Sequence, residues 1–207
     1  MIHGASDYAL TRLHARMASA MRGEDWRRLG SARGTVAVLA LLRASAAERW
    51  VAGLSGSEEP HRIEASLRER FHERVRAIAG WADPGWQAAL EWCGQLVDLN
   101  PADGEADPAV AWLAELQRRV PPLAGNDRDE LHWLLRTISD HRQAFAALAA
   151  GNGWHLREDL QRRLATRMGR NRLCVAHLLT AVALLWLEYE RVRGELLRWA
   201  ALQGAAA

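Results

Sequence analysis

Apolar residues recur along this chain at intervals of three and four positions, whereas alternation at every second position is nearly absent. The clearest stripe joins Ile63, Leu67, Phe71, Val75 and Ile78, and charged side chains occupy the other faces of that segment. The sequence therefore predicts an all-α protein with no significant sheet, in which about eight helices form one or two stacked helical-bundle modules.

Capping residues, prolines and glycines mark where the predicted helices begin and end. The predicted helical segments are 6–22, a short piece around 26–29, 36–42, 45–54, 63–78, 84–99, 108–120, 127–150, 156–168 and 172–202. The segment 36–42 is apolar on most sides, so we expect it to be buried. The first half of the last segment is also broadly apolar and is expected at the centre of the bundle, whereas Gly169 is expected to interrupt the helix before it.

Residues 101–107 are rich in proline, glycine and acidic side chains, which is typical of a linker. They divide the chain into a predicted N-terminal helical module, residues 1–100, and a C-terminal helical module, residues 108–207. The sequence leaves open whether the two modules stay separate or pack as one domain.

The composition has two unusual features. All 27 basic residues are arginine, and ten residues are tryptophan. A net charge of only +2 is weak for a phosphate-binding protein, so we favour codon usage over nucleic-acid binding as the origin of the arginines. Most tryptophans stand at helical spacing with other apolar residues, which favours packing in the core over a role in binding. Cys93 and Cys174 lie inside apolar helical patterns and are expected to be reduced core residues.

The longest nearly apolar run, residues 173–187, is shorter than the roughly 20 residues that a membrane-spanning helix needs. The first residues do not form an apolar signal segment. We therefore expect a cytoplasmic protein, and docking at the periphery of a membrane complex remains open.

Two short patterns approach known catalytic motifs. Glu69 and His72 have the Glu-x-x-His spacing of di-iron bundles, but the sequence has no second such pair, so a solvated helix face is favoured. Arg170 and His177 resemble the Arg-polar-x-His signature of the HEPN ribonucleases, in which histidine acts as acid and base and arginine stabilises phosphoryl charge. Apolar neighbours favour a core histidine at position 177. No catalytic, cofactor or metal site is predicted.

A spaced pattern over about the first hundred residues resembles a known family. Its characteristic positions are Tyr8, Arg12, Arg16, Glu64, Asp98 and Asn100. Together with the leucine-rich segment ending at Arg43, this pattern resembles the N-terminal part of the C subunit of archaeal and bacterial V/A-type ATPases, which is called the d subunit in eukaryotic V-ATPases. The segment 187–193 is similar to the glutamate-rich closing helix of that family. The chain is shorter than a standard member of the family, which has three repeated helical modules, so the resemblance implies a shortened relative.

The resemblance implies a non-enzymatic adaptor that links the rotor shaft of the ATPase to its membrane ring by protein–protein contacts. Oppositely charged surfaces suit such a role, and the stretch 98–130 is acidic. The candidate partner-binding residues form a basic face: Arg157, Arg162, Arg163, Arg167 and Arg170. No small-molecule substrate is expected. Two alternatives remain open, a HEPN-like ribonuclease using Arg170 and His177 and a general nucleic-acid-binding helical protein.

Overall fold

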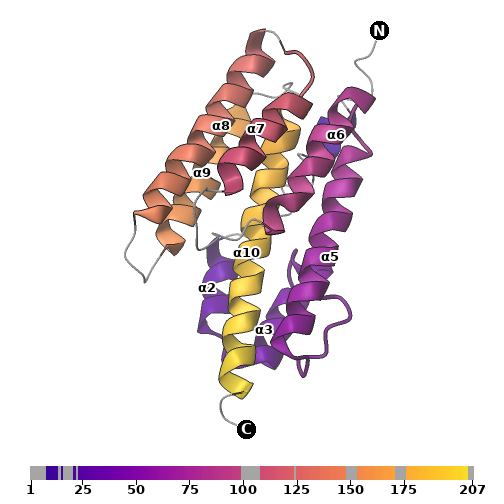
Figure 1. Cartoon of the computed structure of the whole chain (residues 1–207). Helices are drawn as coiled ribbons and strands as arrows, with labels where there is room; N and C mark the ends of the chain where they lie inside the picture. Colours follow the sequence, from indigo (N-terminus) through magenta and orange to yellow (C-terminus); the bar gives the residue numbers. More distant parts are fainter. Residues whose placement is uncertain are drawn as a thin grey trace. The chain divides into compact units, whose positions relative to one another are not determined.

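The computed structural model describes residues 8–13, 15, 21, 23–98, 108–123, 125–147, 153–170 and 176–204. Within these residues the regular structure is helical and contains no strand, which confirms the all-α prediction (Figure 1). The helices are α2 (Gly23–Ser31), α3 (Thr35–Arg43), α4 (Glu48–Val51), α5 (Pro60–Ala79), α6 (Pro84–Trp92), the 3-10 helix η1 (Cys93–Asp98), α7 (Pro108–Arg119), α8 (Gly125–Ala146), α9 (Trp154–Arg170) and α10 (His177–Gly204).

Proline marks the starts of α6 and α7, as the sequence predicts. Helix α6 begins at Pro84 directly after Asp83, and α7 begins at Pro108. The predicted interruption at Gly169 is wrong, because α9 continues through this residue to Arg170. A glycine near the end of a helix lowers its stability without breaking it when the neighbouring residues favour the helix, as they do here.

The chain divides into two compact units, and neither is a continuous stretch of sequence. Unit 1 comprises Met1–Leu13 and Val75–Leu187, and unit 2 comprises His14–Arg74 and Glu188–Ala207. The divisions fall inside α5 and α10, so each of these helices contributes residues to both units. The predicted linker 101–107 lies outside the described residues, and the division at this linker stays a prediction.

The core of unit 1 includes the first half of α10. Residues 177–185 are all buried, which confirms that this broadly apolar segment is enclosed on every side. Leu160, Leu164 and Met168 repeat at every fourth position of α9 and are buried as well. The face of α9 that carries these residues packs towards the core, and its charged residues lie on the remaining faces.

The core of unit 2 is built around the stripe of α5 and an aromatic cluster. Ile63, Leu67 and Phe71 are buried. The ring of Tyr189 lies 5.6 Å from that of Phe71 and 6.0 Å from that of Trp50, measured between centroids. Burial raises the pKa of Tyr189 to about 12, so its hydroxyl stays neutral at physiological pH.

Helix α3 differs from its prediction. The sequence predicts a buried segment, but only Thr35, Val38, Leu39 and Leu42 of this helix are buried. Val36 is 66% exposed and Leu41 is 37% exposed. The helix packs against α2 and α4, and these neighbours cover one side of it. An apolar pattern on all faces shows that a helix tolerates burial, but it does not show how many neighbours the helix has.

No helix in the described part of the chain is both long and apolar enough to cross a membrane.

Candidate binding surfaces

Two arginines of the predicted basic face are used in packing between α8 and α9, which lie side by side (Figure 1). The guanidinium of Arg167 donates to both carboxylate oxygens of Glu130, with Nε–Oε2 at 2.9 Å and Nη2–Oε1 at 2.7 Å. Glu130 is only 3% exposed. Arg157 stacks 4.8 Å from the ring centroid of Phe145 and 5.0 Å from that of Trp154. Both arginines therefore stabilise the helix pair.

The other predicted arginines are more open to solvent. Arg162 is exposed and lies 3.3 Å from Asp159, one turn earlier on the same helix. Arg163 is exposed as well. The side chain of Arg170 lies outside the described residues. The predicted partner surface on α9 stays a prediction, and Arg162 and Arg163 are the members that the structure places on the outside.

The family-pattern residues at the N-terminal side lie near an exposed aromatic stack. Arg12 donates from Nη1 to the hydroxyl oxygen of Tyr8 at 2.8 Å, and its guanidinium lies 4.8 Å from the ring centroid of Trp81. Tyr8 is 55% exposed, and Asp98 is exposed at the end of η1. The predicted residues Arg16 and Asn100 lie outside the described residues.

Glu64 lies in an ion-pair network of unit 2. Its carboxylate lies 2.9 Å from Nη2 of Arg68 on the same helix and 3.1 Å from Nη2 of Arg193 on α10. Burial by itself raises the pKa of Glu64, but hydrogen bonds and charge from Arg68 and Arg193 outweigh it and lower the pKa below its ordinary value. Glu64 therefore stays ionised and joins α5 to α10 within unit 2.

Arginine stacked on tryptophan is a recurrent contact that the sequence analysis missed. At least seven of the ten tryptophans carry a guanidinium within about 5 Å of the ring, and the pairs are Arg12–Trp81, Arg74–Trp50, Arg119–Trp92, Arg157–Trp154, Arg167–Trp133, Arg191–Trp26 and Arg198–Trp199. The abundance of arginine and of tryptophan is visible in the sequence, whereas the pairing of the two residue types depends on the fold. A flat guanidinium covers an aromatic face while its charge stays near water.

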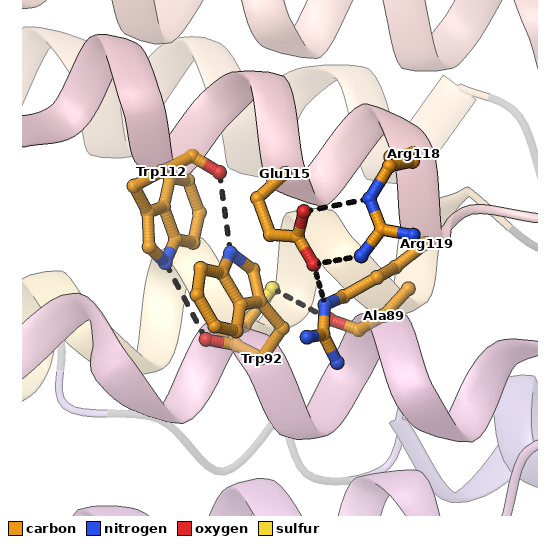
Figure 2. A network of polar contacts seen from close by, with 7 residues as sticks. Ala89, Trp92, Trp112, Glu115, Arg118 and Arg119 are labelled. Carbon is orange, nitrogen blue, oxygen red and sulfur yellow. Dashed lines mark hydrogen bonds and ion pairs between the residues drawn. The ribbon is translucent and has the colours of Figure 1, made fainter.

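A polar network joins α6 to α7 in unit 1 (Figure 2). The indole nitrogen of Trp92 donates to the carbonyl oxygen of Trp112 at 3.2 Å. The indole nitrogen of Trp112 donates in turn to the carbonyl oxygen of Trp92 at 3.4 Å. Oε1 of Glu115 lies 2.5 Å from Nη2 of Arg118 and 2.6 Å from Nε of Arg119. Hydrogen bonds from these arginines lower the pKa of Glu115 to about 2. The network satisfies two indole N–H groups and ties the two helices together.

The thiol of Cys93 is enclosed close to this network. Its sulfur donates to the carbonyl oxygen of Ala89 at 3.3 Å, and burial raises its pKa to about 12. The thiol is protonated at physiological pH and is not a nucleophile there. Cys93 is thus a buried, reduced core residue as predicted, whereas Cys174 lies outside the described residues.

Of the residues in the two near-motifs, the structure describes the side chains of Glu69, His72 and His177, whereas that of Arg170 lies outside the described residues. His177 is 1% exposed at the start of α10, which is the burial expected of a core histidine. This burial weighs against the ribonuclease alternative. Glu69 is exposed and His72 is half-buried on α5. Among the described residues, no three His, Cys, Asp or Glu side chains gather as a metal site would require.

The side of α3 that its neighbours leave uncovered is the most apolar of the exposed surfaces described above. We name Val36, Ala37, Ala40 and Leu41 the α3 outer face. Ala37 is half-buried and the other three are exposed. Contiguous apolar side chains on a protein surface are typical of interaction sites.

The chain was compared with known proteins, and no family model, curated protein or solved structure matches it. The resemblance to the central-stalk family of V/A-type ATPases therefore rests on the sequence pattern.

Proposed function

We propose that this chain is a non-enzymatic adaptor that binds another protein through an exposed apolar helix surface. The observation that carries the proposal is the 66% exposure of Val36 at the start of the apolar segment 36–42, with Leu41 exposed on the same helix. Burial of such side chains against a partner removes apolar surface from water, which is the main driving force of protein association.

In its more specific form, the proposal is an adaptor of the V/A-type ATPase central stalk, placed between the rotor shaft and the membrane ring. The resemblance at Tyr8, Arg12, Glu64 and Asp98 supports this form. A protein that transmits torque needs helices that do not slide past one another. Within unit 2, the contact of Glu64 with Arg193 ties α5 to α10 and is consistent with that requirement.

Reconstitution tests both forms of the proposal. The purified chain is mixed with the purified rotor shaft and, separately, with the purified membrane ring of the ATPase from the same cell, and complexes are measured by size-exclusion chromatography with light scattering. We expect a stoichiometric complex with at least one of them. Failure with both rejects the stalk assignment.

The general form needs a second experiment, which maps partners inside the cell. Because the chain has no lysine, amine-reactive cross-linkers are unsuitable, and a photoreactive residue placed at the exposed Ala40 is used instead. We expect one protein to be cross-linked in stoichiometric yield, and the same probe at the exposed Arg163 on α9 controls for random collision. Equal, weak labelling from both positions would reject the adaptor function.

A further inference from the structure

We propose that the α8–α9 pair is a pH-sensitive element, which opens at one end when a proton binds His141 and brings positive charge between the two helices. The inference goes beyond the adaptor function and does not depend on it, because α8 and α9 belong to unit 1, whereas the α3 outer face belongs to unit 2. Three observations carry it: the place of His141 between the helices, its burial and the charges around it.

Two contacts fix how α8 and α9 lie against each other. Near the end of α8, Phe145 contacts Arg157, and near the start of α8, Glu130 contacts Arg167. The two helices are therefore antiparallel, and the residues between these contacts face one another in order. Since His141 lies about one turn before Phe145, it is opposite the turn of α9 that follows Arg157.

His141 is enclosed at this position. It is 9% exposed, and the centroid of its imidazole lies 6.0 Å from the ring centroid of Phe145. The ring of Phe145 in turn lies so close to the backbone of Gly153 that a Cβ atom added there would overlap it. The imidazole therefore lies in the packed end of the helix pair, where a charged group loses much of its contact with water.

The charges around His141 disfavour a proton on its ring. Among the described residues, the groups whose charge acts on the imidazole are Arg157, Asp159 and Arg163, all on α9, the helix that packs against α8. The one carboxylate among them, that of Asp159, also lies 3.3 Å from Nη1 of Arg162. Burial lowers the pKa of His141 below its ordinary value of 6.5, and the two arginines lower this pKa further, whereas the carboxylate opposes them.

Two further influences do not reverse this balance. Asp140 and Arg142 flank His141 on α8, and their opposite charges largely cancel. The face of Phe145 attracts a cation, but the guanidinium of Arg157 already lies 4.8 Å from the centroid of that ring. A charged imidazole would be a second cation at the same ring.

Acidification therefore favours an open form of this end. In the open form the imidazole is in water and takes up a proton near its ordinary pKa of 6.5, whereas in the closed form it does so only at lower pH. The closed form thus keeps its full stability above about pH 6.5 and loses this contribution as the pH falls through the lower folded pKa. The contact of Glu130 with Arg167 contains no histidine, so we expect the other end to stay closed over this range.

Hydrogen exchange of the intact chain tests the inference. Exchange is measured by mass spectrometry at about pH 7.5 and 5.5, and the rates are corrected for the intrinsic effect of pH. We expect amides of the end near Phe145, residues 139–147 and 153–161, to exchange at least about threefold faster at the lower pH. Amides of the end near Glu130, residues 126–134 and 163–170, should change by less than about twofold.

Nuclear magnetic resonance supplies a second readout that needs no substitution. The imidazole signals of His141 are followed between about pH 5 and 8 in the parent chain. We expect this imidazole to titrate below pH 6.5, because the packed and positively charged surroundings favour its neutral form.

Substitutions assign the acid effect to one side chain. His141→Phe keeps a ring that cannot take up a proton and is expected to remove the faster exchange at pH 5.5. His141→Gln does the same with a smaller uncharged side chain, in case the phenyl ring disturbs the packing. His155→Gln is the matched control, since His155 is exposed on α9 at the same end of the pair, and it should leave the acid effect unchanged. Circular dichroism confirms that each variant folds.

The following outcomes would overturn the inference. They are equal acceleration of exchange at both ends of the pair, acceleration that persists in His141→Phe and His141→Gln, and titration of His141 at or above pH 6.5. Loss of the acid effect in His155→Gln would assign it to a different residue and would overturn the inference as well. None of these measurements uses a partner protein, so they are decided separately from the adaptor function.

Discussion

Arginine side chains in this protein pack as well as carry charge. Arg167 reaches from α9 to the buried Glu130 and also lies 5.2 Å from the ring centroid of Trp133. A lysine would supply the charge but neither the two parallel hydrogen bonds nor the flat surface for stacking. The contact of Arg167 with Glu130 does not follow from its position in the sequence, because the two residues lie 37 positions apart.

Removing this arginine is expected to destabilise the fold. Arg167→Ala leaves the buried carboxylate of Glu130 without its guanidinium and should lower the free energy of unfolding by about 2–3 kcal/mol. Arg163→Ala, an exposed change on the same helix, should lie within about 0.5 kcal/mol of the parent chain. Urea denaturation followed by circular dichroism measures both, and equal effects would show that the ion pair contributes nothing specific.

A second prediction concerns pH and the loop beside α3. Partial burial by itself raises the pKa of Glu58, but hydrogen bonds from Ser55 and Gly56 outweigh it and hold the pKa at about 2. This folded pKa is below the ordinary value of 4.5, so the stabilisation is complete above about pH 4.5 and is lost as the pH falls towards 2. Glu58→Gln should therefore lower Tm at pH 7, and its difference from the parent should disappear near pH 2.

The expected effect of Glu58→Gln is below about 1 kcal/mol, because the carboxylate is largely open to water. Glu59→Gln is the control, because Glu59 is exposed and lacks the contacts with the loop amides that Glu58 makes. Thermal melts of both variants between pH 2 and 7 settle the comparison. A difference for Glu58→Gln that grows on acidification would show that the carboxylate destabilises the loop.

At the scale of the helices, the sequence was informative about periodicity and about proline at the starts of helices, and uninformative about which helices are neighbours. The stripe of α5 and the proline at the start of α6 depend on residues close together in the chain, so both were predicted correctly. The exposure of α3 depends on which helices pack against it, and the stacked arginine–tryptophan pairs mostly depend on residues distant in sequence. The basic face of α9 was similarly visible as a pattern, whereas the use of Arg157 and Arg167 in packing was not.

Two glycines give opposite predictions for the same substitution. Gly56→Ala places a Cβ atom in a left-handed conformation and against Leu39, so it should lower the free energy of unfolding by about 1–3 kcal/mol. Gly30→Ala lies in α2 with nothing within 4 Å of the added atom and should stabilise the chain by about 0.5 kcal/mol. Thermal denaturation distinguishes them, and a loss of stability at both positions would contradict the assigned geometry.

At the scale of the whole molecule, the two compact units share the helices α5 and α10. Residues of α5 and α10 belong to both units, so the units are not independent segments of the chain that could be separated by one cut. The division into these units depends on contacts between residues distant in sequence, which a local composition pattern does not indicate. The predicted division at residues 101–107 lies outside the described residues and stays a prediction.

Sharing helices should make unfolding of the two units cooperative. Phe71→Ala removes a buried ring from the core of unit 2 and should lower the free energy of unfolding by about 3–5 kcal/mol. Hydrogen exchange measured by mass spectrometry should then show faster exchange in residues 177–187, which belong to unit 1, as well as in unit 2. Faster exchange confined to unit 2 would show that the units unfold separately.

Because neither unit is a continuous stretch of sequence, the order in which the helices are synthesised on the ribosome affects folding. Helix α10 is the last of the described helices in chain order, and both cores need it. While the earlier helices leave the exit tunnel, the apolar side chains that α10 will cover remain open to water and to other chains. Neither core closes until residues 177–204 emerge, so the nascent chain is a suitable substrate for chaperones throughout that interval.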